Sequence, residues 1–132
     1  MIELGKRQKL AIVKEVDFGV YLGDEKEKVL LPGKQVPEGA KKGDELEVFI
    51  YRDSSDRLIA TTNMPKLTLG EVALLKVSDV TKIGAFLDWG LEKELLLPFR
   101  EQTYRVKPGE DCLAALYIDK SGRLCATMKL YH

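Results

Sequence analysis

Aromatic residues recur at matched positions in this sequence, where they would share one side of an extended strand. Tyr21 in "GVYLG" and Phe86 in "GAFLDW" each stand two positions after a glycine. Because side chains alternate along a strand, the flanking apolar residues would point inward and these rings outward. An outward ring can stack on an unpaired base, a contact worth roughly 1–3 kcal/mol. The rings could instead cover a neighbouring unit or flank the core, and Tyr51 and Tyr117 present the same choice on a later strand.

Basic residues also recur at matched positions. Lys34 and Arg100 follow prolines, and Arg57 and Arg123 each stand four residues after an aspartate. Lys and Arg are the usual protein partners of phosphate groups, but such residues are also common as solvated loop charges. The spacing of Asp53–Arg57 and Asp119–Arg123 predicts an ion pair across a turn, which would contribute only about 0–1 kcal/mol if exposed. The repetition fits turn geometry and RNA contact equally well.

These matches belong to an internal repeat. "DRLIATTN" near residue 60 and "GRLCATMK" near residue 126 align at an offset of 66, and "LLP" at 30–32 meets "LLP" at 96–98. Towards the N-terminus the offset is 65, so the second copy holds one extra residue near "DWGLEKE". A match of this length at one period indicates two related structural units. We place them at residues 1–64 and 65–132, with Pro65 as a stiff break between them.

Each unit has the pattern of a small all-β domain. Short runs rich in branched apolar residues are separated by glycine, proline and polar turns, and helical spacing is weak. Five strands in about 60 residues, with a polar loop after the third, are typical of a Greek-key barrel of the OB type. The expected strands are 7–16, 19–23, 27–32, 46–51 and 58–62, then 71–80, 84–89, 92–98, 112–118 and 124–128.

Composition limits the function classes. The chain has 132 residues with 45% hydrophobic and 32% charged, so it should fold. Lys+Arg and Asp+Glu both number 21, so any affinity for a polyanion should be weak, although a local basic patch remains compatible with zero net charge. No apolar run is long enough to cross a bilayer and the N-terminus does not resemble a secretory signal, so we expect a cytoplasmic protein with no membrane association.

The sequence offers no catalytic or metal-binding motif. There is no glycine-rich phosphate loop and no nucleophile elbow, so we expect no enzymatic activity and no cofactor. The single histidine is His132, and zinc sites need four ligands at known spacings, so no metal site is expected. Cys112 and Cys125 stand where the first copy has Leu46 and Ile59, which predicts that both act as core hydrophobes.

The sequence resembles the S1 domain, an RNA-binding OB fold, nearly along its whole length and twice. The resemblance rests on "DFGVYL", "KKGDELEV" and "DSSDRLIAT" in the first copy and on "KIGAFL", "KPGEDCLA" and "DKSGRLCAT" in the second. The wording "GAFLDWGLEKELLLPFREQ" is closer still to the conserved virulence factor B (YitL-like) family. Members of that family carry tandem S1-like domains followed by a winged-helix domain. The resemblance leaves open whether additional S1-like and winged-helix domains accompany this chain in a longer protein.

The resemblance implies which residues would face RNA. They are Phe18, Tyr21 and Arg57 in the first copy and Phe86 and Arg123 in the second, with Asp53 and Asp119 on the turns. The match departs from the family where Ile83 replaces the ring of Phe18 and where Pro32 and Pro98 stand near a position that often holds histidine. Trp89 could replace the lost ring or pack between the units.

Two functions from different classes follow. The first is a module that binds single-stranded RNA weakly, with little sequence preference, as part of a bacterial regulatory protein. Its candidate residues are Phe18, Tyr21, Lys34, Arg57, Phe86, Trp89, Arg100 and Arg123. The alternative is a protein–protein interaction scaffold whose OB faces dock another domain or partner.

Overall fold

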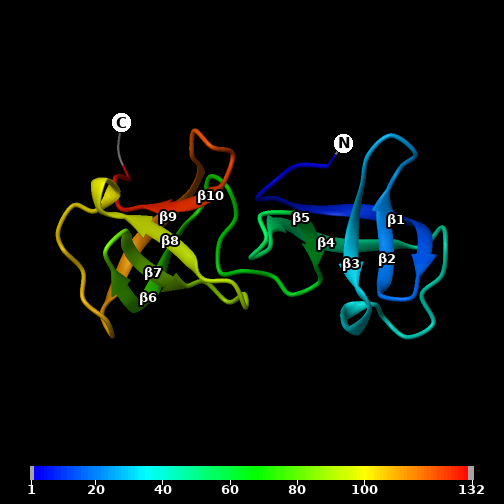
Figure 1. Ribbon diagram of the computed structural model, residues 1–132, viewed down its shortest axis with the longest axis horizontal. Coiled ribbons are helices and arrows are strands. Elements are labelled where there is room, and N and C mark those ends of the chain that lie inside the picture. The colour runs from blue at the N-terminus through cyan, green and yellow to red at the C-terminus, as the bar shows by residue number, and fades with distance from the viewer. Residues whose placement is uncertain (1, 131–132) are drawn as a thin grey trace. The chain divides into compact units, whose positions relative to one another are not determined.

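The computed structural model describes residues 2–130 and contains ten strands in two groups of five (Figure 1). Unit 1 ends at Met64 and unit 2 begins at Pro65. The strands of unit 1 are β1 (Arg7–Val16), β2 (Gly19–Gly23), β3 (Lys28–Pro32), β4 (Glu45–Arg52) and β5 (Leu58–Thr61). Those of unit 2 are β6 (Val72–Thr81), β7 (Gly84–Asp88), β8 (Leu95–Pro98), β9 (Asp111–Ile118) and β10 (Leu124–Thr127). Within the described residues the helical elements are two single 3₁₀ turns, η1 (Gly33–Gln35) and η2 (Phe99–Glu101), so the all-β prediction is confirmed.

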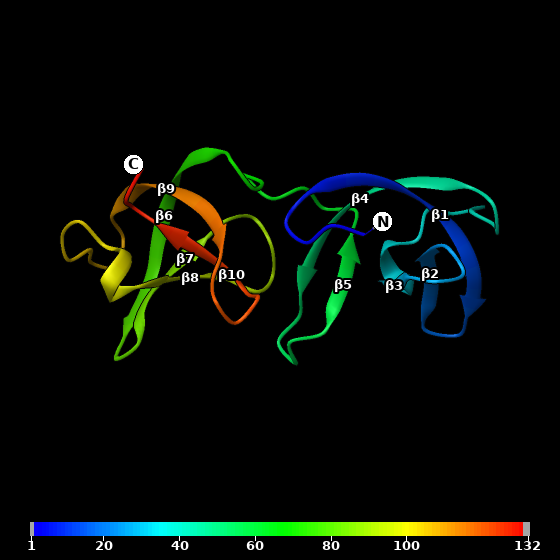
Figure 2. The same ribbon diagram turned by 90° about the horizontal axis from the view of Figure 1, so that it is seen from above.

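Unit 1 is a closed barrel with the strand order β1-β2-β3-β5-β4. The neighbours are antiparallel except for β3 and β5, which meet in parallel at Leu30 and Ile59. Strand β1 pairs with both β2 and β4, and its register with β2 shifts between Ile12 and Lys14. Such a bulge bends a strand, and the strong curve of β1 is visible in Figure 2. The curve allows β1 to pair with β4 along its first part and with β2 along its last part.

Unit 2 repeats this arrangement as a five-stranded sheet with the order β10-β9-β6-β7-β8. The register of β6 with β7 shifts between Val77 and Asp79, at the same place as in unit 1. Strands β8 and β10 at the two ends of the sheet lie next to each other, as β3 and β5 do in unit 1. Two five-stranded OB-type barrels, as the sequence predicts, therefore form the architecture.

Alternation along the strands separates core from surface. Val20 and Leu22 of β2 and Val29 and Leu31 of β3 are buried in unit 1, in one cluster with Ile12, Val48, Ile50 and Ala60. Phe49 departs from the alternation. Its neighbours on β4, Val48 and Ile50, are buried in the core, and Phe49 is fully buried as well. Its ring stacks on Tyr51, with centroids 6.4 Å apart.

A glycine opens the second strand of each unit for a steric reason. Gly19 has φ of +153° and Gly84 has φ of +147°, which L side chains rarely adopt. A methyl group on Gly19 would overlap the carbonyl oxygen of Leu31 on β3, and one on Gly84 would lie 2.5 Å from the carbonyl oxygen of Leu97. The closeness of the second and third strands thus depends on these two glycines.

Both cysteines are free thiols in the core of unit 2, as the repeat predicts. Burial, reinforced by the nearby Asp119 carboxylate, raises the pKa of Cys125 to about 11. Burial also raises the pKa of Cys112. Because burial favours the neutral Cys125 thiol in the folded state, the stabilising contribution of that thiol is lost as the pH rises from about 9 to about 11.

We expect Cys125 to be inert towards thiol reagents in the folded protein. At pH 8 a group with a pKa of about 11 is thiolate in roughly one molecule in a thousand, and the side chain is also shielded. The measurement is the rate of reaction with a chromogenic disulfide at pH 8, with and without urea, in the Cys112→Ala variant. Slow reaction without urea and one fast thiol in urea are expected. Fast reaction of the native protein would contradict the burial.

Residues 2–130 contain neither a metal-binding cluster nor a helix that could span a membrane. No group of His, Cys, Asp and Glu side chains in this range could hold a metal ion, and His132 lies outside it. No helix in this range combines the length and the apolar character needed to cross a membrane.

Candidate nucleic-acid interface

The outer face of unit 1 is a row of side chains that runs across all five strands. Strand pairing places Lys14 opposite Tyr21, Tyr21 opposite Leu30, Leu30 beside Ile59, and Ile59 opposite Tyr51. Lys14 is exposed and the other four are half-buried. The sequence predicts this side for Tyr21 and Tyr51, and the register adds the apolar residues between them. A continuous surface of rings and aliphatic groups with a cation at its edge results.

Phe18 and Tyr21 form the aromatic part of this face. The Phe18 side chain is 60% exposed, and its ring meets that of Tyr21 edge to face at 6.5 Å between centroids and 86° between planes. The Nζ of Lys28, on β3, lies 5.6 Å from the centroid of the Tyr21 ring. Tyr21 is thus held between an aromatic edge and a cation, while Phe18 presents an open ring to solvent.

The 3₁₀ turn η1 lies at the end of this face nearest Phe18. The main-chain NH of Gly33 donates to the carbonyl oxygen of Phe18 at 2.9 Å, so the turn is anchored beside the ring. Gln35 fixes its other side, because its Oε1 accepts hydrogen bonds from Thr61 Oγ1 at 2.7 Å and from the Thr62 NH at 2.8 Å. Lys34 lies between these two anchors and its side chain is exposed.

Arg57 lies at the opposite end of the face, on the turn between β4 and β5. Its guanidinium contacts Asp53 Oδ2 at 3.2 Å, which confirms the predicted ion pair. The other oxygen of Asp53 accepts hydrogen bonds from the main-chain NH groups of Arg57 and Ser55, and these bonds lower the pKa of Asp53. Arg57 and Lys28 each stand two residues before the paired Ile59 and Leu30, so the parallel register places the two cations at neighbouring positions.

Unit 2 has the same outward ring in different surroundings. Phe86 is half-buried on β7 and lies opposite Asp79 on β6 and opposite Leu96 on β8. Ile83 occupies the position of Phe18 and is 57% exposed, so an aliphatic group replaces the open ring. Glu94 precedes β8 at the position that corresponds to Lys28. Rings and cations are therefore fewer on the outer face of unit 2.

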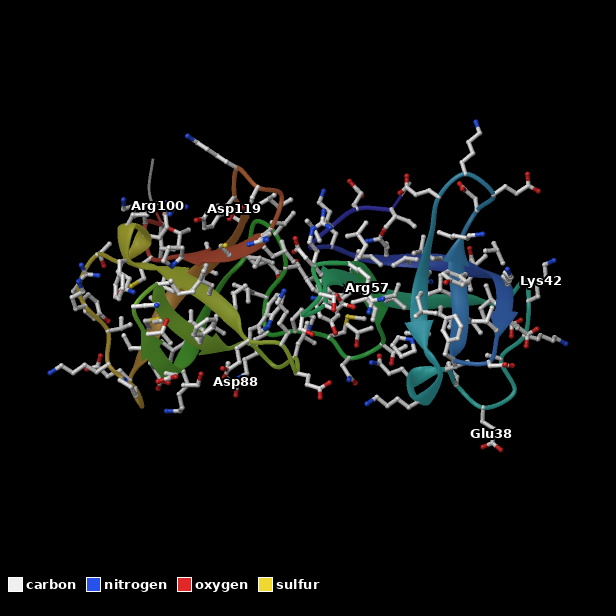
Figure 3. The ribbon with its side chains drawn as sticks, viewed as in Figure 1. Glu38, Lys42, Arg57, Asp88, Arg100 and Asp119 are labelled. Carbon is white, nitrogen blue, oxygen red and sulfur yellow. The ribbon has the colours of Figure 1, made fainter. Side chains whose placement is uncertain are left out.

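Arg100 lies on η2, near the turn between β9 and β10. Figure 3 shows Arg100 and Asp119 at the same side of unit 2, and Asp88 at the opposite side. The Arg100 Nε is 3.9 Å from Glu101 Oε2, while Glu101 Oε1 accepts a hydrogen bond from Thr127 Oγ1 at 2.7 Å. Arg100, Glu101 and Asp119 line a shallow pocket with Tyr117, Ile118, Lys120 and Ser121.

The β9–β10 turn repeats the geometry of its counterpart in unit 1. Asp119 Oδ1 accepts hydrogen bonds from the main-chain NH groups of Ser121 and Arg123, at 2.9 and 3.0 Å. Burial acts to raise the pKa of Asp119, but the hydrogen bonds from Ser121 and Arg123 outweigh it, so this pKa is lowered. The aspartate in both units thus shapes the turn that carries the arginine.

Trp89 does not contribute to either outer face. Its side chain is 2% exposed, and its indole NH donates to the carbonyl oxygen of Lys93 at 2.6 Å. A stacking ring must be open to solvent, so the placement of Trp89 argues against the role that the sequence suggests for it.

Two cations of the outer face of unit 1, Lys14 and Lys28, are absent from the predicted set. Lys28 belongs to the charged run "DEKEK" and Lys14 stands next to a bulge, so alternation alone does not assign them a side. The alignment of the two copies could have identified them, because the corresponding positions in the second copy carry the opposite charge, Asp79 and Glu94.

Comparison with known proteins gives relatives for both units. The family model described as "S1 domain" matches residues 4–63 and again residues 69–129. The uncharacterized protein YitL of Bacillus subtilis (strain 168) is 34% identical over 128 residues, which cover 92% of this chain and 43% of YitL. Conserved virulence factor B of Staphylococcus aureus (strain N315) is 37% identical over 87 residues, or 62% of this chain and 29% of that protein.

A solved structure supports the fold assignment. The crystal structure of a multidomain protein with nucleic acid binding domains from Streptococcus pneumoniae TIGR4 superposes with a TM-score of 0.77 at 23% identity. The superposition covers 93% of this chain and 45% of that one. The chain thus spans less than half the length of each of these relatives. With the S1 model matching both barrels, the chain belongs to the S1 domain family.

Proposed function

We propose that this chain binds single-stranded RNA, with little sequence preference, through the outer face of at least one of its S1 domains. The observation that carries the proposal is the exposed Phe18 ring, which Tyr21 supports edge-on at one end of an outer face that also carries Lys14, Lys28, Lys34 and Arg57. Bases of single strands stack on such rings, and any base offers a π-face, so affinity arises without sequence readout. Unit 2 offers the corresponding Phe86, Arg100 and Arg123.

The family and the relatives support this proposal. S1 membership and the likeness to a protein with nucleic acid binding domains agree with a nucleic-acid role. The similarity to conserved virulence factor B suggests that the chain acts within a bacterial regulatory protein, in the cytoplasm, alongside further domains. The coverage of less than half of each relative is consistent with such a longer protein.

We expect RNA binding with a shallow dependence on salt. The outer face of unit 1 carries Lys14, Lys28, Lys34 and Arg57, so about four phosphates could be neutralised there. For single strands the slope of log K against log salt is about −0.7 for each phosphate, so a slope no steeper than about −3 is expected. The measurement is fluorescence anisotropy of a labelled RNA oligomer of about ten nucleotides, over a series of salt concentrations.

A duplex of the same sequence and a DNA strand are the matched controls for this measurement. The duplex should bind more weakly, because its bases are paired and cannot stack on Phe18. If the single strand does not bind even at low salt, the proposal is wrong and the protein-interaction scaffold is favoured. The exposed Leu74 and Leu113, which face each other across β6 and β9, are the apolar feature of unit 2 that such a scaffold would use.

A further inference from the structure

We infer that unit 1, and not unit 2, holds the RNA strand, and that the outer face of unit 2 repels the phosphate backbone. This inference rests on the proposed function. The inference follows from a comparison of equivalent positions in the two units. Strand pairing identifies these positions directly, so the comparison does not depend on how the two sequences are aligned. Around the outward ring, cations in unit 1 are replaced by carboxylates in unit 2.

The first exchange lies on the strand next to the ring. In unit 1 the residue opposite Tyr21, on β1, is Lys14. In unit 2 the residue opposite Phe86, on β6, is Asp79. Both follow the bulge of their strand and both are exposed, so the two positions are structurally equivalent. A phosphate next to a base stacked at this ring would meet a cation in unit 1 and a carboxylate in unit 2.

The second exchange lies on the other side of the ring. The Lys28 ammonium lies over the Tyr21 ring, and the corresponding residue beside Phe86 is the exposed Glu94. Gly23, which pairs with Lys28, corresponds to the exposed Asp88. A cation and an uncharged residue in unit 1 are thus replaced by two carboxylates in unit 2.

The same exchange changes the surroundings of the turn arginines. Arg57 shares its end of the face with Lys28, at neighbouring positions of the parallel pair. Arg123 stands at the corresponding place in unit 2, where Glu94 occupies the position that corresponds to Lys28. In unit 1 a second cation therefore accompanies Arg57, which pairs with Asp53, while in unit 2 a carboxylate takes the place of that second cation.

The third exchange lies on the 3₁₀ turns. Gln35 accepts a hydrogen bond from Thr61 Oγ1, and Glu101 accepts the same bond from Thr127 Oγ1, each at 2.7 Å. The structural role of the two residues is the same, but Glu101 adds a negative charge 3.9 Å from the guanidinium of Arg100. The neighbour of Lys34 is uncharged. Arg100 is thus partly neutralised where Lys34 is not.

Exchanges at the turns run in the opposite direction, since on the turn that carries the arginine Ser54 and Asp56 of unit 1 correspond to Lys120 and Gly122 of unit 2. At the turn between the first two strands, Asp17 of unit 1 corresponds to Lys82 of unit 2, and both are exposed. This position adjoins Phe18 in unit 1 and Ile83 in unit 2, so the cation of unit 2 lies next to a residue with no ring. Charges interact over about 8 Å at physiological salt. The exchanges of Lys14 for Asp79 and of Lys28 for Glu94 flank the outward ring, whereas the opposite exchanges lie on turns, so the former act most directly on a phosphate beside a base stacked at the ring.

The test compares pairs of neutralising substitutions in the full chain. Lys14→Gln with Lys28→Gln should lower the affinity for the RNA oligomer on the order of tenfold at low salt, and should reduce the salt slope by about 1.4. The matched control is Lys9→Gln with Lys42→Gln, which removes two exposed lysines of unit 1 that are not part of the row from Lys14 to Tyr51. Lys42 is labelled in Figure 3. The control pair should leave the affinity within about twofold and the slope nearly unchanged. Equal thermal unfolding midpoints will show that all variants are folded.

The second arm applies the same change of charge to unit 2. Arg100→Gln with Arg123→Gln should lower the affinity far less than the roughly tenfold loss expected for the Lys14 and Lys28 pair, and Asp88→Asn with Glu94→Gln should not reduce it. A loss from the Arg100 and Arg123 pair as large as that from the Lys14 and Lys28 pair would overturn the inference, as would no effect of the lysine pair. RNA binding by the wild type with either result leaves the proposed function intact. A wild type that does not bind RNA overturns both.

Discussion

Replacing Phe18 with alanine is expected to weaken binding of single-stranded RNA by about 5- to 150-fold, which corresponds to the loss of one base stack worth roughly 1–3 kcal/mol. The ring is 60% exposed and its edge contact with Tyr21 holds it in place before RNA arrives. Little side-chain entropy is therefore lost on binding. Tyr21→Ala should have a smaller direct effect, because the Lys28 ammonium already lies over that ring.

Ile83→Ala is the matched control, since Ile83 occupies the equivalent turn of unit 2 with nearly the same exposure. It should leave the affinity unchanged, because an aliphatic side chain offers no stacking surface. Both variants are measured by anisotropy at low salt and by thermal unfolding, which should change little for residues so exposed. An unchanged affinity for Phe18→Ala, with binding by the wild type intact, would show that the RNA contacts another surface.

The strands were predictable because local signals and the global fold agree. The expected ranges 7–16 and 19–23 coincide with β1 and β2, and the other strands differ from expectation by up to three residues at an end. Glycines, prolines and polar turns bound each apolar run, and the repeat supplies every signal twice. The short 3₁₀ turns η1 and η2 have no such signal, since three residues carry no periodicity.

The surface of the barrel was only partly predictable, because alternation fails where a strand ends or bulges. Tyr21 and Phe86, in the middle of short strands, point outward as expected, although both are half-buried. Trp89 lies one residue beyond β7, where alternation no longer fixes a side, and it is buried. Phe49 is buried on a strand whose pattern predicts it to be outward. Burial on both sides of a strand depends on long-range contacts that a local pattern does not contain.

The charged residues of the outer face could be placed only once the register of the strands was known. In the sequence, Lys28 is one member of a mixed run of charges, and only its pairing across β2 and β3 places it over the Tyr21 ring. The charge reversal between Lys28 and Glu94 is visible when the two copies are aligned, yet it acquires meaning only once both positions are known to flank an outward ring. Net charge, which is zero for the chain, conceals this difference.

Gly19→Ala is expected to destabilise unit 1 by roughly 3 kcal/mol or more, a loss comparable to the stability of a domain of this size. A methyl group there would overlap the Leu31 carbonyl oxygen on β3, and an alanine would also resist the φ of +153°. The collision involves main chain on both sides, so no rotamer change relieves it. Gly39→Ala is the control: Gly39 also has a positive φ, +82°, but open space around it, so a cost of only about 1 kcal/mol is expected.

The same substitution connects stability to function, because Gly19 follows Phe18 and opens the strand that carries Tyr21. Residue-resolved hydrogen exchange should show faster exchange in β1–β5 of Gly19→Ala, and RNA binding should fall with it. Gly84→Ala places the same kind of clash in unit 2, against the carbonyl oxygen of Leu97, and should leave the RNA affinity nearly intact if unit 1 holds the strand. Equal stability of Gly19→Ala and Gly39→Ala would contradict the close approach of β2 and β3. Loss of RNA binding in Gly84→Ala, with β1–β5 still protected, would instead assign the strand to unit 2.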